Sequence, residues 1–260
     1  MGSLALYARA IRRSALSGRP SLGRLDDRLV FVFGSPRSGT TFLADAIGSV
    51  PGFAGLGEVN PLKAAIPNLS AREVRTILDR VRRLGLVGGR RAVEQTPETA
   101  FVLREVAAAF PQATLIHALR DGRDVVASLL ERGWLGADRD DADDTGAAYG
   151  VHPRFWVEAG REKEFREASE ARRCAWAWRR YVSAVTESGV PVTEVRYERL
   201  VTDPAATAED VARVLGVPLT AVTHVLGAAH DASVGRWRRD LAPDQVADVE
   251  AEAGDLIAAL

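Results

Sequence analysis

An apolar run, a glycine-containing loop and a helical pattern follow one another directly at residues 29–47. The run 29–34 is rich in Val and Phe, which is typical of a buried parallel strand. The segment after the loop reads as a helix that packs back on the sheet through Phe42, Leu43 and Ile47. A strand, a glycine loop and a helix in this order direct backbone N–H groups and a helix N-terminus toward an anion. The segment therefore predicts a phosphate-binding loop.

This loop departs from the Walker A sequence of nucleoside-triphosphate enzymes. Gly34 and Gly39 have the Walker A spacing, G-x-x-x-x-G. The lysine that would reach the β- and γ-phosphates is replaced by Thr40, and the cation of the loop is Arg37. We therefore expect a loop that holds a phosphate group but not a magnesium–triphosphate complex.

The rest of the chain alternates between strand and helix patterns. Strands are predicted at about 29–34, 91–95, 113–119 and 192–197. Helices are predicted from the capping box at Ser70, at 98–110, around Ser128 and from Thr207 to Leu215. This alternation predicts an α/β fold of three layers, a P-loop-type fold whose central, mostly parallel sheet is flanked by helices. Its ligand crevice is expected beyond the carboxyl ends of the strands. The glycine-rich segment 51–57 reads as a turn.

Length and charge restrict the class of protein. For 260 residues we expect a basic helical extension at 1–28 and a single domain at 29–260. The 34 basic and 35 acidic side chains nearly cancel, so bulk charge does not indicate a nucleic-acid partner. No stretch reaches the ~18 apolar residues of a membrane span, and the extension lacks the apolar core of a secretory signal. We expect a cytoplasmic protein whose extension either packs on the domain or touches a membrane surface.

The rare residue types narrow the chemistry further. Cys174 is the only cysteine, which excludes an intramolecular disulfide and a metal site with several thiolates. Its neighbours Trp176 and Trp178 favour a buried structural thiol over a reactive one. The only lysines, Lys63 and Lys163, lie outside the phosphate motifs, so a cationic catalyst must be an arginine. We expect no metal ligands.

Four segments, in this order, resemble the motifs of sulfotransferases that use 3′-phosphoadenosine 5′-phosphosulfate (PAPS). In that family, each of the four motifs contacts one part of the nucleotide. They are the 5′-phosphosulfate loop Pro36-Arg37-Ser38-Gly39-Thr40-Thr41-Phe42, the 3′-phosphate motif from Arg120 to Ser128, the adenine strand with Tyr197, and the closing loop with Gly235, Arg236 and Trp237. The four segments span nearly the whole chain.

The resemblance implies a role for each of these side chains. The amides of residues 38–41 and the hydroxyls of Thr40 and Thr41 would hold the 5′-phosphate, and Arg37 would neutralise the charge that develops as the S–O bond breaks. The fork of Arg120 would hold the 3′-phosphate with Ser128 and Arg236. The alternative for Arg120 is a surface ion pair with Asp121 or Asp124.

The aromatic candidates have structural alternatives. Tyr197 and Phe42 would stack against adenine, but both lie on apolar elements, so core packing is the alternative for each. Trp237 either closes over the purine or anchors the terminal helix.

The acceptor hydroxyl must lose a proton, and two bases are candidates. Cytosolic-type sulfotransferases use a histidine after a Lys-Thr pair on the strand that here ends in Glu94-Gln95-Thr96-Pro97, which contains neither Lys nor His. The chain looks more similar to the branch of protein-tyrosine and several bacterial sulfotransferases, in which a Gly-Glu pair supplies a carboxylate base, and Glu58 occupies that position. His152 is the other candidate, since it lies in the acidic segment 136–165, which is either a substrate lid or a solvated loop. His117 lies in a predicted core strand and reads as structural.

The resemblance implies metal-independent transfer of a sulfuryl group from PAPS to a hydroxyl of a small-molecule acceptor, leaving 3′-phosphoadenosine 5′-phosphate. A carbohydrate, a lipid or a phenolic metabolite would fit as the acceptor, and an oligomer is compatible with the sequence. One alternative is a non-catalytic nucleotide- or partner-binding protein on the same fold. A P-loop kinase is the other, which Thr40 and Arg37 disfavour.

Overall fold

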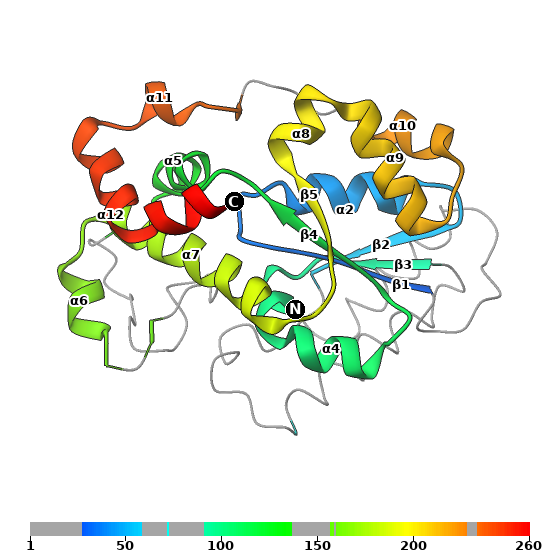
Figure 1. Cartoon of the computed structure of the whole chain (residues 1–260), viewed down its shortest axis with the longest axis horizontal. Coiled ribbons are helices and arrows are strands. Elements are labelled where there is room, and N and C mark those ends of the chain that lie inside the picture. The colour runs from blue at the N-terminus through cyan, green and yellow to red at the C-terminus, as the bar shows by residue number, and fades with distance from the viewer. Residues whose placement is uncertain (1–27, 59–71, 73–90, 137–156, 159, 228–232) are drawn as a thin grey trace.

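The centre of the molecule is a parallel sheet. The computed structural model describes residues 28–58, 72, 91–136, 157–158, 160–227 and 233–260. Within this part, five strands pair in the order β2-β3-β1-β4-β5, and all four pairings are parallel (Figure 1). The strands are β1 (Leu29–Phe33), β2 (Phe53–Gly57), β3 (Arg91–Glu94), β4 (Thr114–Leu119) and β5 (Thr193–Arg196). The predicted three-layer α/β fold and the four predicted strands are confirmed.

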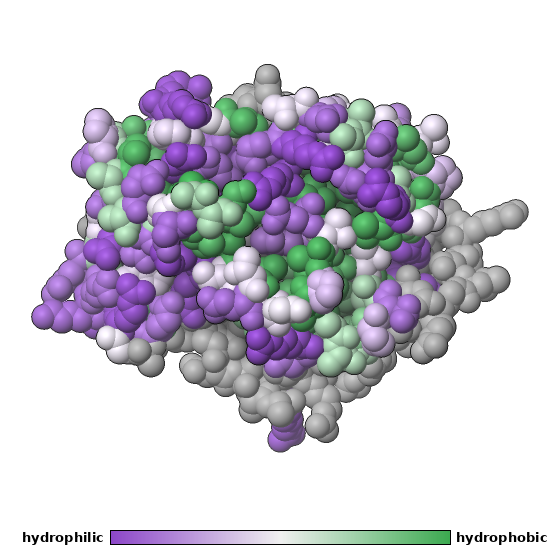
Figure 2. Space-filling view, viewed as in Figure 1, coloured by the Kyte–Doolittle hydropathy of each residue, from purple (hydrophilic) through white to green (hydrophobic). Residues whose placement is uncertain are grey.

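Helices cover both faces of this sheet (Figure 1). One face packs against α2 (Thr40–Ser49), α8 (Tyr197–Thr202), α9 (Pro204–Leu215) and α10 (Leu219–Leu226). The other face packs against the 3-10 helix η3 (Pro97–Val102), α4 (Leu103–Ala109), α5 (Gly122–Arg132), α7 (Glu170–Ser188) and α12 (Pro243–Ala259). The short helices α6 (Glu162–Glu167) and α11 (Trp237–Asp240) lie at the periphery, where Figure 2 shows mostly hydrophilic side chains.

Strand β1 divides the core into two layers. Leu29, Phe31 and Phe33 pack on the side of α5 and α7, whereas Val30 and Val32 pack on the side of α2 and α9. None of the five is more than 1% exposed. A strand that is covered on both faces must be apolar at every position, which explains the continuous run that the sequence shows.

The structure of the segment 51–57 differs from the predicted turn. Only its first residues turn, with Gly52 at φ 91°, and Phe53–Gly57 forms the edge strand β2 beside β3. The glycines that suggested a turn serve close packing instead, because a Cβ on Gly48 of α2 would lie 2.9 Å from the backbone of Gly55. Phe53, Ala54 and Leu56 are buried.

The other predicted segments have mixed outcomes. The predicted helix 98–110 begins as η3 and continues as α4. Three predictions lie outside the described residues: the helix from Ser70 except Arg72, the extension 1–28 except Arg28, and most of the segment 136–165 with His152.

Candidate active site

The predicted phosphate loop leaves the carboxyl end of β1 and enters α2. Gly39 precedes the helix with φ 85°, a conformation that favours glycine, and a Cβ there would lie 2.7 Å from the ring of Tyr197. Arg37 has φ 74° and is the only non-glycine residue with positive φ in the described ranges. The hydroxyl of Ser38 is buried and has no hydrogen-bond partner in the part of the chain that the structure describes. The loop is therefore tightly folded around a site with an unused donor.

Arg37 connects this loop to helix α5. Its Nε donates a hydrogen bond to Oγ of Ser128 at 2.9 Å, and its carbonyl oxygen accepts one from Nη1 of Arg120 at 3.1 Å. Burial lowers the pKa of the Arg37 guanidinium, and the positive charges of Arg132 and Arg120 lower it further. Three predicted site residues thus meet at one place, although they lie up to 91 positions apart.

Arg120 follows β4 directly and is 6% exposed. Besides the Arg37 carbonyl, it donates to the carbonyl oxygen of Ser233, and its guanidinium lies 4.8 Å from the centre of the Tyr197 ring. The alternative of a surface ion pair holds only in part: Arg120 lies 4.0 Å from Asp124, but both side chains are buried, and Asp121 binds Arg123 instead. Burial lowers the pKa of Arg120, and Asp124 opposes this effect.

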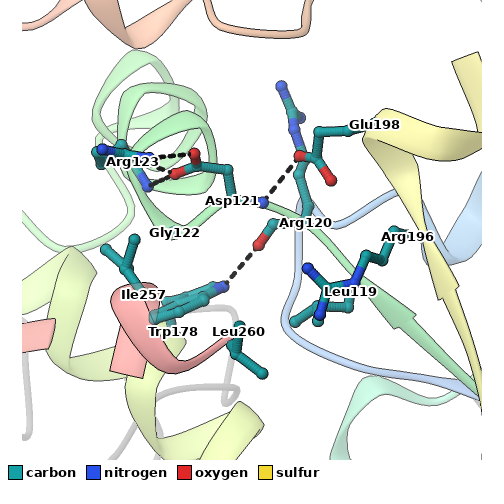
Figure 3. Close-up of a pocket in the computed structure, with 10 residues that line it drawn as sticks. All are labelled: Leu119, Arg120, Asp121, Gly122, Arg123, Trp178, Arg196, Glu198, Ile257 and Leu260. Carbon is teal, nitrogen blue, oxygen red and sulfur yellow. Dashed lines mark hydrogen bonds and ion pairs between the residues drawn. The ribbon is translucent and has the colours of Figure 1, made fainter. Parts of the chain in front are cut away.

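The turn between β4 and α5 is supported from behind (Figure 3). The indole N–H of Trp178 donates to the Arg120 carbonyl at 3.2 Å, and its ring lies so close that a Cβ on Gly122 would be 2.9 Å away. The carboxylate of Glu198 accepts the N–H of Asp121 at 2.9 Å. Burial raises the pKa of Glu198. These residues line a separate cavity of about 200 Å³ and hold the backbone of Arg120 in place.

The predicted nucleotide residues meet around one cavity of about 270 Å³. Its lining combines the phosphate loop, Arg120 directly after β4, Ser128 of α5, the start of α8 and the segment before α11. The lining residues are Arg37, Gly39, Thr40, Thr41, Phe42, Arg120, Ser128, Tyr197, Ser233 and Arg236. Nine of these ten are predicted site residues. Ser233 is the addition, and the only sequence signal for it is its place in the Gly/Arg segment. The predicted residues Pro36, Ser38 and Gly235 lie in the adjoining backbone.

Comparison with known protein families assigns the chain to one of them. The model of the sulfotransferase family matches residues 70–221, which is more than half of the chain. The chain belongs to the sulfotransferase family. The matched region contains Arg120, Ser128 and Tyr197 but begins after the phosphate loop, so the loop is supported by its own geometry. No curated protein matches the sequence.

Solved sulfotransferases share the fold at low sequence identity. A sulfotransferase domain from the curacin biosynthetic pathway has a TM-score of 0.55 and 16% identity over 92% of this chain and 98% of that domain. The sulfotransferase domain of the Synechococcus PCC 7002 olefin synthase has a TM-score of 0.51 and 17% identity over 91% and 96%. STF9 from Mycobacterium avium has a TM-score of 0.51 and 13% identity over 99% and 84%.

The predicted base Glu58 lies on the β2 side of the sheet. Glu58 follows β2 at the same edge as the phosphate loop, about two strand spacings (~10 Å) from β1. The Gln95 N–H donates to the Gly57 carbonyl at 3.1 Å, and its side-chain Nε2 donates to Oγ1 of Thr40 at 3.3 Å. Gln95 thus contacts the residue that stands in the place of the Walker lysine.

The remaining aromatic and cationic candidates differ in their surroundings. Arg236 binds Asp240 at 2.5 Å and Glu131 at 3.1 Å. Trp237 does not line this cavity of about 270 Å³ and packs against the core, with Arg123 stacked on its ring at 4.5 Å, which favours the anchoring alternative. Phe42 both packs against the core and lines the cavity.

The predicted structural residues are buried. His117 is 2% exposed, and burial lowers its pKa to about 4, so the ring is neutral at pH 7. Burial also raises the pKa of the Cys174 thiol, which makes it a poor nucleophile. Among the described residues, no His, Cys, Asp or Glu side chains group together as a metal site, and no helix there is long and apolar enough to cross a membrane.

Proposed function

We propose that this sulfotransferase moves a sulfuryl group from PAPS to a hydroxyl of a small-molecule acceptor without a metal ion. The observation that carries the proposal is the convergence of the phosphate loop, Arg120, Ser128 and Tyr197 on one cavity. Two separate sets of donors surround it, as a nucleotide with phosphates on both its 3′ and 5′ positions requires.

The donor inventory fits such a nucleotide. The buried Ser38 hydroxyl and the Nε of Arg120 have no hydrogen-bond partner in the part of the chain that is described. Leaving a buried polar group unsatisfied costs about 1–3 kcal/mol, which phosphate oxygens would recover. The N-terminus of α2 adds backbone amides on the side of the 5′-phosphate, and the absent Cβ of Gly39 leaves room for the Tyr197 ring beside them.

The chain's own residues then have distinct tasks in transfer. Because Ser128 occupies the Nε of Arg37, the terminal nitrogens of Arg37 are the donors for the bridging oxygen, where charge develops as the S–O bond breaks. Glu58 takes the proton of the acceptor hydroxyl while the oxygen of that hydroxyl bonds to sulfur. The products are the sulfated acceptor and 3′-phosphoadenosine 5′-phosphate.

Calorimetry with adenosine 3′,5′-bisphosphate, with and without EDTA, tests this function when combined with transfer from labelled PAPS to a panel of carbohydrates, lipids and phenols. We expect tight binding that EDTA does not change, and labelling of one acceptor class. Turnover of ATP with Mg²⁺ would instead identify a kinase. Bisphosphate binding without transfer to any acceptor would favour the non-catalytic alternative.

A further inference from the structure

Asp124 is a buried carboxylate that the nucleotide motifs leave without a role. It lies in the first turn of α5 and is 1% exposed. Its Oδ2 accepts the backbone N–H of Gly235 at 2.7 Å, and its Oδ1 accepts that of Trp237 at 3.0 Å. Both donors lie more than 110 positions away, so one side chain fastens a distant segment to α5.

That segment, Ser233–Trp237, forms one wall of the nucleotide cavity. Ser233 and Arg236 line the cavity. The carbonyl oxygen of Ser233 accepts a hydrogen bond from Nη2 of Arg120, and its hydroxyl lies 2.9 Å from the hydroxyl of Tyr197. The wall therefore contacts two residues that we assign to the nucleotide.

We propose that Asp124 is a positioning residue that fixes this wall and, through Ser233, orients the guanidinium of Arg120. This inference rests on the proposed use of the cavity by a 3′-phosphorylated nucleotide. Both carboxylate oxygens of Asp124 accept backbone N–H groups. The distance of 4.0 Å from its Oδ2 to Nη2 of Arg120 is too long for a hydrogen bond.

The alternative fastening of the wall is weaker. Arg236 also ties the segment to α5 through Glu131, but the Glu131 side chain is 61% exposed. Exposed ion pairs contribute little to stability, whereas charge-assisted hydrogen bonds that N–H groups donate to a buried carboxylate are strong. Asp124 is thus the main fastening, and it holds the Ser233 carbonyl where Arg120 meets it.

The isosteric substitution Asp124→Asn separates this role from simple filling of space. An asparagine has one acceptor oxygen, and its NH2 group faces the second backbone donor, so one of the two bonds is lost. Asp121→Asn is the matched control, because it removes the same charge in the same turn of α5 while asparagine still caps the helix.

The test combines calorimetry and amide hydrogen exchange on the full chain. For Asp124→Asn we expect the Kd of adenosine 3′,5′-bisphosphate to rise about tenfold or more, the Kd of AMP to rise less, and the Gly235 and Trp237 amides to exchange about tenfold faster or more. The amides of α5 and α7 should keep their protection. Asp121→Asn should leave both Kd values within about twofold of the wild type.

Three results would overturn the inference: unchanged exchange at Gly235 and Trp237, faster exchange there with an unchanged bisphosphate Kd, or an equal loss of protection throughout α5 and α7. The last would show a merely structural role. A wild-type protein that did not bind the bisphosphate would contradict the proposed function instead, and the exchange rates alone would then decide whether Asp124 holds the wall.

Discussion

The Nε of Arg37 donates to the hydroxyl of Ser128 at 2.9 Å, and this bond joins the phosphate loop to helix α5. Arg120 adds a second link, because it donates to the Arg37 carbonyl at 3.1 Å. The residues expected at the 5′-phosphate and those expected at the 3′-phosphate are therefore in direct contact. Their separate contributions can be measured by removing one phosphate or one side chain at a time.

Nucleotide choice depends on Arg120. Adenosine 3′,5′-bisphosphate should bind about 10²-fold more tightly than AMP, because charge-assisted hydrogen bonds to a buried guanidinium contribute about 1.5–3 kcal/mol. Arg120→Ala should remove most of this difference in calorimetry. Arg123→Ala is the control, since Arg123 binds Asp121 outside the nucleotide cavity. Similar affinities of the wild type for AMP and the bisphosphate would refute the assignment of Arg120 and Ser128.

Arg37 should act mainly in the transition state. Arg37→Ala should lower kcat about 10²–10³-fold and change the Kd of the bisphosphate much less, because the bridging charge develops as the bond breaks. Transfer by the wild type should persist in excess EDTA. Arg37→Gly is the backbone control, because glycine adopts the positive φ of this position without strain. If Arg37→Ala kept its kcat and only bound PAPS weakly, Arg37 would be a ground-state ligand.

Gln95 should affect only the 5′ side of the nucleotide. Its amide donates to Oγ1 of Thr40, so the Thr40 hydroxyl hydrogen is free to point toward a phosphate. Gln95→Glu should reverse this bond and add a negative charge, which we expect to weaken bisphosphate binding about tenfold. Adenosine 3′-monophosphate, which lacks the 5′-phosphate, should bind the variant and the wild type alike. An equal loss for both ligands would contradict this role.

The parts of the site that the sequence predicts are those with local signals. The strand, the two glycines and Arg37 lie within a dozen residues, and Ser128 follows Arg120 at a helical spacing. Trp178, Glu198 and Asp124 act through contacts with residues 58 to 113 positions away, so nothing beside them in the chain indicates their partners. The glycines of 51–57 predict a turn where the structure has β2, because they suit a bend as well as they suit the close approach of Gly48 to Gly55.

Stability should depend on pH through His117. Burial lowers the pKa of this ring to about 4, so below pH 6.5 the unfolded chain binds a proton that the folded chain does not. The contribution of His117 to the free energy of unfolding is complete above pH 6.5 and is lost as the pH falls toward 4. Between pH 7.5 and 5 the free energy of unfolding should fall by about 2 kcal/mol for this reason. Urea unfolding of the wild type and of His117→Leu at both pH values measures it. An identical pH dependence in the two proteins would show that His117 does not contribute.

The general base is the last prediction, and Glu58 is the proposed residue. Glu58→Gln keeps the volume and the hydrogen-bonding reach of the side chain but removes its basicity. We therefore expect kcat to fall about 10²-fold or more while the Kd of the bisphosphate stays nearly unchanged, because Glu58 is placed two strands away from β1 and outside the nucleotide cavity. Steady-state transfer from PAPS and calorimetry measure the two quantities separately.

His152 is the competing base, and its variant completes the comparison. If the segment around His152 acts as a lid, His152→Ala should raise the KM of the acceptor with a smaller change in kcat, because it would remove a binding contact and not the proton acceptor. A Glu58→Gln variant that turns over normally, together with an inactive His152→Ala variant, would exchange the two roles. The similarity to the branch with a carboxylate base would then no longer hold for this chain.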